Sequence, residues 1–365
     1  MTYRELMQRL RDLEQECRAL RESRDELERI RARRLYRFSH HAGRLLSFLA
    51  RRPHPPAPPT VAPAGPPGTE GVADFWGHEV RRYRAPEAKP FSWLHHPMVA
   101  AYKNRRVTGD PDQEWFSWVR REFAPAGLPR GLSLGCGLGV VERKAIGAGL
   151  CRRVDAFDIS PEAVRGAAAL AREGEYPHTH YFVADLNQFA LAPARWDIAF
   201  ATMSLHHVSN LEDLFSEVAR ALKPGGLFVV DEYVGPSRFQ FGERQLSYIN
   251  ALLAALPSRL RCGPAGTEKG LFHGLDPEEV AAKDPSEAIR SEEILPTLER
   301  DFETLAKADY GGNLLQFLLS DIVGNFDPER EEDRTVMELL LLFEETLNEE
   351  GVLPSDFAVV VARKR

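Results

Sequence analysis

The chain has 365 residues, of which 43% are hydrophobic and 28% are charged, and its formal net charge is −7. This composition supplies at least one sizeable core, which excludes a wholly disordered chain, and the acidic balance argues against bulk nucleic-acid binding. No apolar run approaches the roughly 18 residues of a membrane-spanning helix, and the charged start is unlike a signal peptide, so we expect a cytoplasmic protein. The four cysteines lack CxxC or CxxH spacing, which argues against structural zinc and a disulfide framework.

The first 35 residues carry a heptad pattern. Apolar residues recur at alternating steps of three and four from Tyr3 to Leu20, and the series decays from Arg24 onward. About four heptads predict a coiled coil over residues 1–35, and because so short a coiled coil is marginal alone, we expect it to form a homo-oligomer. A solvent-exposed single helix is the alternative interpretation.

A basic segment and a proline-rich segment follow. Residues 29–52 contain eight arginines and no acidic residue, interleaved with leucines and aromatic residues. The pattern predicts a basic amphipathic helix over residues 36–52, which either lies on the anionic inner face of a membrane or packs against a partner helix. Residues 53–72 are proline-rich and predict an extended linker, so we place the start of a globular domain at residue 73.

Residues 73–365 alternate short apolar or β-branched runs with amphipathic stretches. This alternation predicts an α/β domain with a parallel sheet and crossover helices. No internal repeat is visible. The predicted strands lie at 131–135, 153–158, 180–184, 196–202 and 226–233, with two more near 302–310 and 356–363.

A glycine-rich turn follows the first predicted strand. Gly135, Gly137 and Gly139 permit a tight turn and a close approach of ligand to backbone, although such a turn alone also serves strand–helix packing. Asp158 ends the next strand, where a carboxylate can accept both hydroxyls of a ribose, and Asp185 ends the third strand, where it can meet an adenine amino group. Alternatively, Asp158 caps the following helix and Asp185 shapes a turn. Together the three strand ends supply the parts of an adenosine site.

In this order of motifs the chain resembles the class I S-adenosylmethionine-dependent methyltransferases over roughly residues 75–365. Three segments match the fourth and fifth strand region of that family. They are residues 196–200, residues 205–208 and Leu-Lys-Pro-Gly-Gly at 222–226. A nicotinamide-binding domain is the alternative, but the turn reads G-x-G-x-G rather than G-x-G-x-x-G. The resemblance implies a doubly wound, seven-stranded, Rossmann-like sheet with an antiparallel last strand, which residues 356–362 suit.

The resemblance also implies the cofactor, S-adenosylmethionine, and its contacts. The glycines would cradle the methionine end, Asp158 would hold the ribose, and Asp185 with the Leu186 backbone would hold the adenine, one face of which Ile159 would cover. The full implied set is Gly135, Cys136, Gly137, Gly139, Asp158, Ile159, Asp185, Leu186 and Thr202.

Candidate catalytic residues follow the fourth and fifth strands. His206 and His207 come after the fourth strand, and an imidazole with a pKa near neutrality is suited to take a hydroxyl proton. We favour His207 as the residue facing the pocket, and Glu232, after the fifth strand, as a further catalytic candidate. The alternative is that both histidines are structural. We predict no metal, because Asp231 and Glu232 alone do not make a metal site.

Substrate contacts are expected where the later strands end, because ligands of open α/β sheets bind outside the carboxyl ends of the strands. Residues 236–300 form an insertion that we interpret as a substrate lid. For Arg290, a surface ion pair with Glu287 or Glu293 is the alternative. The predicted substrate contacts are Tyr233, Arg238, Gln240, Arg290 and Tyr310.

The acceptor is predicted from weaker signals. Three short motifs resemble those of a bacterial methyltransferase subgroup of surface-polysaccharide and glycan loci. They are Glu-Tyr-Val-Gly-Pro, Pro-Ser-Glu-Ala-Ile-Arg and Tyr-Gly-Gly. This resemblance implies O-methylation of a sugar hydroxyl of a glycan or of its lipid- or nucleotide-linked precursor. A lipid, quinone or secondary metabolite is the alternative acceptor, and a non-catalytic coiled-coil scaffold is the alternative class. Nucleic-acid base methylation is disfavoured, because no Asn/Asp-Pro-Pro-aromatic turn follows the fourth strand.

Overall fold

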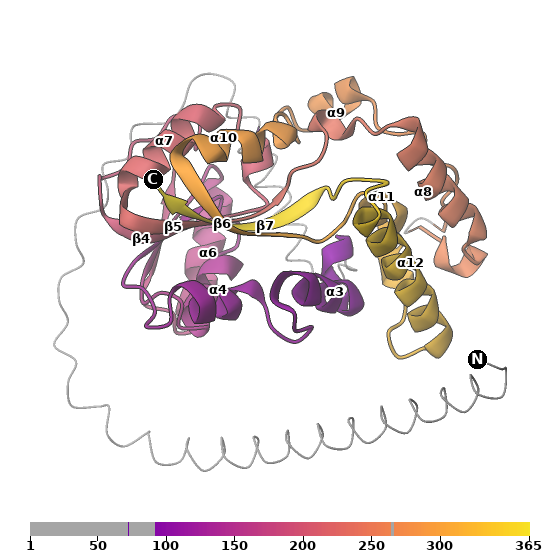
Figure 1. Ribbon diagram of the computed structural model, residues 1–365, viewed down its shortest axis with the longest axis horizontal. Coiled ribbons are helices and arrows are strands. Elements are labelled where there is room, and N and C mark those ends of the chain that lie inside the picture. Colours follow the sequence, from indigo (N-terminus) through magenta and orange to yellow (C-terminus); the bar gives the residue numbers. More distant parts are fainter. Residues whose placement is uncertain (1–71, 73–91, 264–265) are drawn as a thin grey trace, which may run out of the picture. The chain divides into compact units, whose positions relative to one another are not determined.

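The computed structural model describes Val72, residues 92–263 and residues 266–365 (Figure 1). The predicted coiled coil, the basic helix and, apart from Val72, the proline-rich linker lie outside the described residues, so they stay predictions. Within the part of the chain that is described, no helix combines the length and the apolar character that crossing a bilayer requires.

A seven-stranded sheet in the order β3-β2-β1-β4-β5-β7-β6 forms the centre of the domain. The first five strands are parallel, whereas β7 runs antiparallel to β5 and to β6, as the sequence predicts. This architecture confirms the α/β fold with an antiparallel last strand. The strands are β1 (Gly131–Leu134), β2 (Val154–Asp158), β3 (Thr179–Val183), β4 (Trp196–Thr202), β5 (Leu222–Tyr233), β6 (Phe302–Asp309) and β7 (Phe357–Lys364).

β5 begins four residues earlier than the sequence predicts. Leu222 already pairs with Trp196, and the regular pairing resumes between Leu227 and Ile198. The Lys-Pro-Gly-Gly stretch between these pairs therefore bulges out of the ladder, because proline cannot donate to a ladder and glycine tolerates the turn. The turn signal marks a bulge inside the strand rather than its start.

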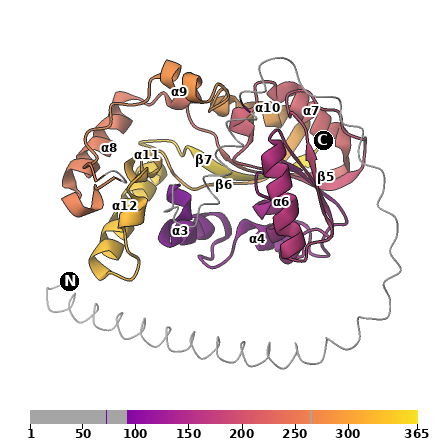
Figure 2. The same cartoon turned by 180° about the vertical axis from the view of Figure 1, so that it is seen from behind.

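Both faces of the sheet are buried, and the strand residues alternate between two cores. Ile198 and Phe200 of β4 belong to one core, together with side chains of α3 (Pro97–Thr108), α4 (Trp115–Phe123) and α5 (Val140–Gly147). Ala199 and Ala201 belong to the other, together with α7 (Leu211–Ala221) and α10 (Ile294–Asp301). The period of two places successive side chains on opposite faces. α6 (Pro161–Glu173) packs on β2 and β3 and is labelled in Figure 2.

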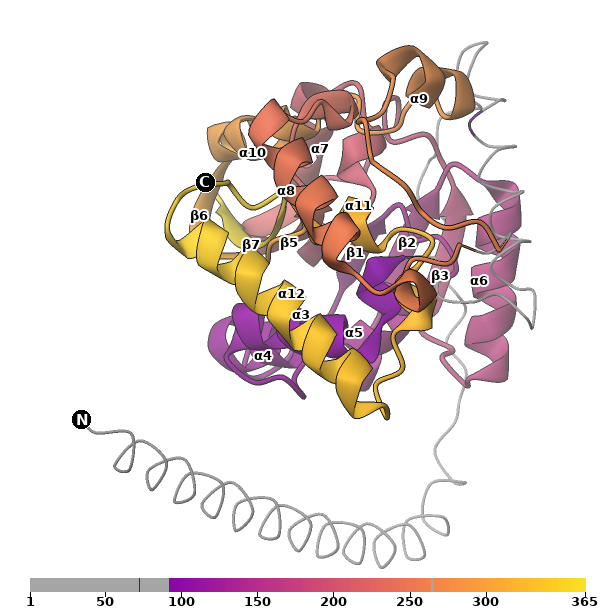
Figure 3. The ribbon, with the colours of Figure 1, turned by 90° about the vertical axis from the view of Figure 1, so that its right-hand side faces the viewer.

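The chain between β5 and β7 adds a further helical layer, in which α8 lies beside α12 (Figure 3). From the sequence, Leu252, Leu253 and Leu256 facing the cleft would favour a lipid-type acceptor. Leu253 of α8 and Leu256 just after it are buried in the core, Leu252 is partly buried against that core, and none of the three lines the pocket described below. The elements of this part are η3 (Ser237–Phe239), α8 (Glu243–Ala255), η4 (Ser258–Leu260), α9 (Pro277–Lys283), η5 (Ser291–Glu293), α11 (Leu315–Leu319), η6 (Val323–Asn325) and α12 (Glu331–Glu349), and the remaining short helices of the described chain are η1 (Trp93–His95) and η2 (Leu205–His207).

A buried carboxylate of α12 holds the start of α11. Glu344 is fully buried and accepts hydrogen bonds from the backbone N–H groups of Gly312 (2.8 Å), Leu314 (2.8 Å) and Leu315 (2.9 Å). The first N–H groups of a helix have no partner within the helix, and a negative charge at that end also favours the helix dipole. Glu344 thus ties the connection after β6 to α12.

We predict that Glu344→Ala lowers the free energy of unfolding by about 3 kcal/mol, because three buried N–H donors lose a charged acceptor. Glu344→Gln, which keeps one acceptor oxygen, should lose less. Denaturant unfolding of the full chain measures both values. Glu349→Ala is the matched control, because Glu349 is exposed on the same helix and pairs only with Arg106 among the described residues. Equal losses for Glu344→Ala and Glu349→Ala would contradict the assignment.

Candidate functional site

A pocket lies at the carboxyl ends of β1, β2, β3 and β4. It encloses about 840 Å³, a volume that includes open solvent at its mouth. The neighbouring strands are parallel, so the residues that follow them meet at one edge of the sheet. The pocket is lined by Val72, Gly135, Gly137, Asp158, Ile159, Ala163, Asp185, Leu186, Asn187, Met203, Ser204, His207, Val208 and Ser286.

The three glycines of the turn serve different purposes. All three have positive φ angles, of 70° at Gly135, 51° at Gly137 and 74° at Gly139. A Cβ at Gly135 would overlap the side chain of Ser204, whereas a Cβ at Gly137 would meet nothing within 4 Å. A Cβ at Gly139 would overlap the Tyr181 hydroxyl, so this glycine serves packing, and it does not line the pocket.

Asp158 joins the end of β2 to the glycine turn. One of its carboxylate oxygens accepts the Gly137 N–H (2.8 Å) and the other accepts the Ser160 N–H (2.9 Å). Ser160, not Asp158, caps α6, since its hydroxyl accepts the Ala163 N–H. Burial raises the pKa of Asp158, and the two N–H donors oppose that rise. Each carboxylate oxygen can accept a second donor, as ribose hydroxyls would require.

Asp185 presents an acceptor without a partner. Its Oδ1 accepts from the backbone N–H (2.9 Å) and the amide nitrogen (3.1 Å) of Asn187. Its Oδ2 is buried and has no hydrogen-bond partner among the described residues. A buried acceptor of this kind is costly unless a ligand satisfies it. Asp185 therefore shapes a turn, as the alternative interpretation holds, and also offers Oδ2 to a donor such as an adenine amino group.

Two predicted cofactor residues point elsewhere. Cys136 is buried in the core beside α5, and Thr202 has a buried hydroxyl with no partner among the described residues; neither lines the pocket. Cys136 lies between two pocket glycines, but its side chain points away because the turn exposes backbone rather than side chains there. Ile159 and Leu186 do line the pocket, with Met203 and Val208 as further apolar neighbours.

Sequence reasoning missed several lining residues, and most of them had a usable signal. Asn187 follows β3, while Met203 and Ser204 follow β4, so each stands at a strand end of the same sheet edge. Met203 has a positive φ of 49°, which is uncommon for a residue with a side chain and turns the chain into the pocket. Ser286 had no local signal, because it comes from the insertion and reaches the pocket only through the tertiary fold.

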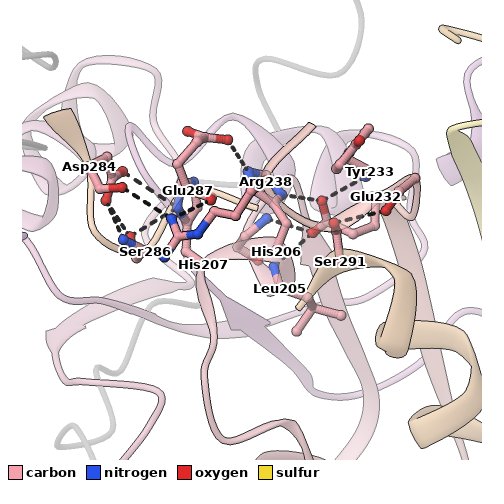
Figure 4. A network of polar contacts seen from close by, with 12 residues as sticks. Leu205, His206, His207, Glu232, Tyr233, Arg238, Asp284, Ser286, Glu287 and Ser291 are labelled. Carbon is pink, nitrogen blue, oxygen red and sulfur yellow. Dashed lines mark hydrogen bonds and ion pairs between the residues drawn. The ribbon is translucent and has the colours of Figure 1, made fainter. Parts of the chain in front are cut away.

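His206 and Glu232 form a buried ion pair (Figure 4). Glu232 is fully buried and also accepts the backbone N–H groups of Ser204 and Leu205, each at 2.7 Å. Burial alone would lower the pKa of His206, but the carboxylates of Glu232, Glu287 and Asp284 outweigh it and raise the pKa to about 9. His206 therefore carries a proton at neutral pH and cannot act as a base.

His207 lines the pocket and is neutral. Its Nδ1 lies 3.1 Å from the Ser286 hydroxyl and 3.6 Å from an Asp284 carboxylate oxygen. Burial, followed by the charges of His206 and Arg238, holds the pKa of His207 well below its ordinary value. The two adjacent histidines thus have opposite protonation states at neutral pH.

The ligating atoms of His206, His207 and Glu287 lie within 4.8 Å of one another, a spacing that suits a metal ion. The Nε2 of His206 is 3.7 Å from Glu287. These three side chains offer one ligand atom each, and treatment with EDTA and Zn²⁺, described below, tests whether they bind a metal.

The five predicted substrate residues do not line the pocket. The Tyr233 hydroxyl donates to the Pro236 carbonyl, and Tyr310 is fully buried with its hydroxyl donating to Asp231. These two tyrosines therefore stabilise the framework, because the polar segments at the ends of β5 and β6 are folded inward instead of facing a ligand. The other three are Arg238, which donates to the carbonyls of Pro285 and Glu287, Gln240, which donates to those of Arg238 and Leu275, and Arg290, which forms ion pairs with Glu212 and Glu293.

Comparison with known proteins identifies the central segment. Residues 132–230 match the family model described as a methyltransferase domain. Malonyl-[acyl-carrier protein] O-methyltransferase of Serratia marcescens is 29% identical over 136 residues, which are 36% of this chain and 51% of the relative. Sterol 4-C-methyltransferase strm-1 of Caenorhabditis elegans is 31% identical over 104 residues, which are 28% of this chain and 30% of the relative. The chain thus spans about half or less of these two relatives.

One solved structure with a similar fold is an S-adenosylmethionine-dependent methyltransferase from Mesorhizobium loti. It is 20% identical in sequence, the match covers 68% of this chain and 98% of the other, and the TM-score is 0.41. Another is geranyl diphosphate C-methyltransferase from Streptomyces coelicolor A3(2), with 15% identity, coverage of 83% and 100%, and a TM-score of 0.46. The family match supports the sequence prediction of a methyltransferase domain over this segment, for which the sequence predicts S-adenosylmethionine as the cofactor. The open turn at Gly137 and the unpartnered Oδ2 of Asp185 fit that cofactor.

We predict that Asp158→Ala weakens binding of S-adenosylmethionine about 10- to 100-fold. The substitution removes the buried charged acceptor and also frees the turn at Gly137, and a hydrogen bond to a charged group contributes about 1.5–3 kcal/mol. Isothermal titration with the cofactor or with S-adenosylhomocysteine measures the change. Asp213→Ala, at an exposed position in the first turn of α7, is the control. Unchanged affinity in the Asp158 variant would remove this residue from the cofactor site.

The His206–Glu232 pair predicts a pH dependence of stability. The pKa of His206 is about 9 in the folded chain against an ordinary 6.5, so its stabilisation is fully present below pH 6.5 and is lost as pH rises toward 9. In denaturant unfolding across that range, the native chain should lose stability relative to His206→Gln, which has no such titration. Parallel curves for the two proteins would show that the pair does not titrate as described.

Proposed function

We propose that this protein is an S-adenosylmethionine-dependent methyltransferase that methylates a hydroxyl oxygen. One observation carries the proposal: a single pocket combines ribose- and adenine-type acceptors, Asp158 and Asp185, with the polar pair His207 and Ser286. We assign the cofactor to Gly135, Gly137, Asp158, Ile159, Asp185 and Leu186.

The proposed chemistry needs one base. S-adenosylmethionine supplies a methyl group on a sulfonium sulfur, and the acceptor oxygen forms its bond to that carbon as the carbon–sulfur bond breaks. The hydroxyl proton must then leave, and we assign it to His207, which is neutral and lines the pocket. His206 is already protonated, and Glu232 accepts three backbone N–H groups, so we assign both to positioning the turn.

For the acceptor, we propose a sugar hydroxyl of a glycan or of its lipid- or nucleotide-linked precursor. The motif resemblance and the hydroxyl of Ser286 at the pocket support this choice. The predicted coiled coil and basic segment would hold such an enzyme near lipid-linked glycan at the inner face of a membrane. Leu252, Leu253 and Leu256, whose exposure to the cleft would favour a lipid acceptor, do not line the pocket.

A lipid or small metabolite is the second candidate acceptor. Ile159, Met203 and Val208 give the pocket an apolar side, and relatives in the comparison carry names of malonyl-acyl-carrier-protein, sterol and squalene methyltransferases. These relatives match only part of the chain.

Labelling distinguishes the candidates. The full chain and Asp158→Ala are incubated with methyl-labelled S-adenosylmethionine and an extract of the source cells, and the label is fractionated. Variant-sensitive label in polysaccharide or lipid-linked glycan supports the first acceptor, whereas label confined to other lipids or small molecules supports the second. No label, in an extract where an added control methyltransferase works, would favour the non-catalytic scaffold.

We predict that His207→Ala lowers kcat about 100-fold, because general-base catalysis contributes roughly 10²–10⁴-fold. Affinity for S-adenosylmethionine should stay within about 3-fold, since the assigned cofactor acceptors remain. Steady-state kinetics on the labelled fraction and calorimetry measure the two quantities. His273→Ala, at an exposed histidine, is the control. Normal turnover of the His207 variant would exclude it as the base.

A further inference from the structure

A short segment of the insertion lies against His207, and we call residues 284–290 the strap. We infer that Asp284 and Ser286 of the strap position His207 as a base by holding its proton on Nδ1 and its lone pair on Nε2. This inference rests on the proposed function and adds two positioning residues to it. Neither residue was among the predicted site residues.

Three atoms in a row define the arrangement (Figure 4). The Ser286 hydroxyl lies 2.6 Å from Oδ1 of Asp284 and 3.1 Å from Nδ1 of His207. The same Oδ1 accepts the Ser286 backbone N–H at 2.8 Å, which fixes the serine relative to the carboxylate. Asp284 is 3% exposed, so solvent does not compete for it.

The direction of the hydrogen bonds follows from donor counting. A carboxylate oxygen only accepts, so the single hydroxyl proton of Ser286 points to Asp284. The serine oxygen can then only accept from His207, which requires the proton of the neutral imidazole to be on Nδ1. The lone pair is therefore on Nε2 of a ring that lines the pocket. A base with the proton on the wrong nitrogen loses most of its activity even where the geometry is intact.

The strap is tied to the framework at several points. Arg238 donates its backbone N–H to Ala288 (2.7 Å) and its guanidinium to the carbonyls of Glu287 (2.7 Å) and Pro285 (2.6 Å). The Ile289 N–H donates to the carbonyl of His206 at 3.0 Å. The Arg238 bonds join the strap to η3, and the Ile289 bond joins it to η2, which carries both histidines.

Two residues that contact each other where the strap meets η3 have an unfavourable backbone conformation. Arg238 has φ of 55° and Ala288 has φ of 48°, both in the left-handed region that disfavours residues with a Cβ. Such conformations persist where the surrounding contacts impose them, and they gather at functional sites. Among the described residues of the insertion, this backbone strain lies where the strap contacts the segment after β5, and not in the rest of the insertion. The location of the strain indicates that the strap is held in place to position His207 and is not a loosely attached lid over the pocket.

Kinetics of three variants test the roles. Ser286→Ala breaks the row of bonds and should lower kcat about 10-fold or more, whereas Ser286→Thr keeps the hydroxyl and should restore kcat to within about 3-fold of the native value. Asp284→Asn can donate its amide to Ser286, which turns the serine proton toward His207, and should lower kcat at least as much as Ser286→Ala. In all three, KM for S-adenosylmethionine should change little.

Ser291→Ala is the matched control. It also removes a buried hydroxyl just beyond the strap, but that hydroxyl donates to the Gly235 carbonyl and, among the hydrogen bonds of the described residues, forms none with either histidine. A loss of kcat in Ser291→Ala equal to that in Ser286→Ala would mean that the effect is structural, and would overturn the inference.

Nitrogen NMR reads the proton position without an acceptor substrate. In histidine-labelled full chain, the signals that disappear in His207→Gln belong to His207. They should report a proton on Nδ1 in the native protein, and a different or averaged state in Ser286→Ala and Asp284→Asn. A proton on Nε2 in the native protein would overturn the inference.

The test separates this inference from the proposed function. If the native chain neither binds nor consumes S-adenosylmethionine, the proposed function fails, and with it the catalytic meaning of the strap. If it methylates and the strap variants do so equally well, only the strap inference fails. Loss of activity on EDTA treatment, reversed by Zn²⁺, would also overturn it, because His207 would then be a metal ligand with His206 and Glu287.

Discussion

The carboxylate of Glu232 organises the acceptor side of the site. It is fully buried on β5, and it bonds His206 and the backbone N–H groups of Ser204 and Leu205 at the exit of β4. Taking such a charge out of water is costly, and removing either partner of a buried ion pair typically costs 3–5 kcal/mol. The pair therefore contributes more to a defined geometry than to net stability. Ser204 abuts Gly135, so the same bonds fix the turn after β4 against the glycine turn after β1.

The two halves of the pocket come from different kinds of structure. The cofactor half is built from residues that directly follow parallel strands, and the sheet alone brings them together. The acceptor half depends on η2 and on the strap, which comes from an insertion whose Phe239 and Phe241 pack on Phe317 of α11. The insertion supplies Ser286 at the pocket and the groups that surround His207.

The protonation states illustrate how surroundings override residue type. His206 and His207 are neighbours in sequence, with the same ordinary pKa, and neither the pattern nor the spacing separates them. Glu232, Glu287 and Asp284 surround His206 and raise its pKa to about 9, whereas burial and the positive charge of His206 lower that of His207. The polar residues at the end of β5 were similarly ambiguous, since the sequence does not show whether they face a ligand or the framework. In the structure Tyr233 and Arg238 turn inward and donate hydrogen bonds to carbonyls of the framework.

The sequence by itself determined the seven strands, the antiparallel last strand and most of the cofactor side. These features are local, because a hydrophobic run defines each strand and the residue after its end is placed by the sheet edge. Asp158, Asp185 and two of the three glycines could therefore be located from order and spacing. Only the tertiary structure decided the acceptor side, where Ser286 meets a histidine 79 residues away and where buried carboxylates assign the proton to one of two adjacent imidazoles. Such contacts depend on how an insertion folds back, and no local pattern encodes that path.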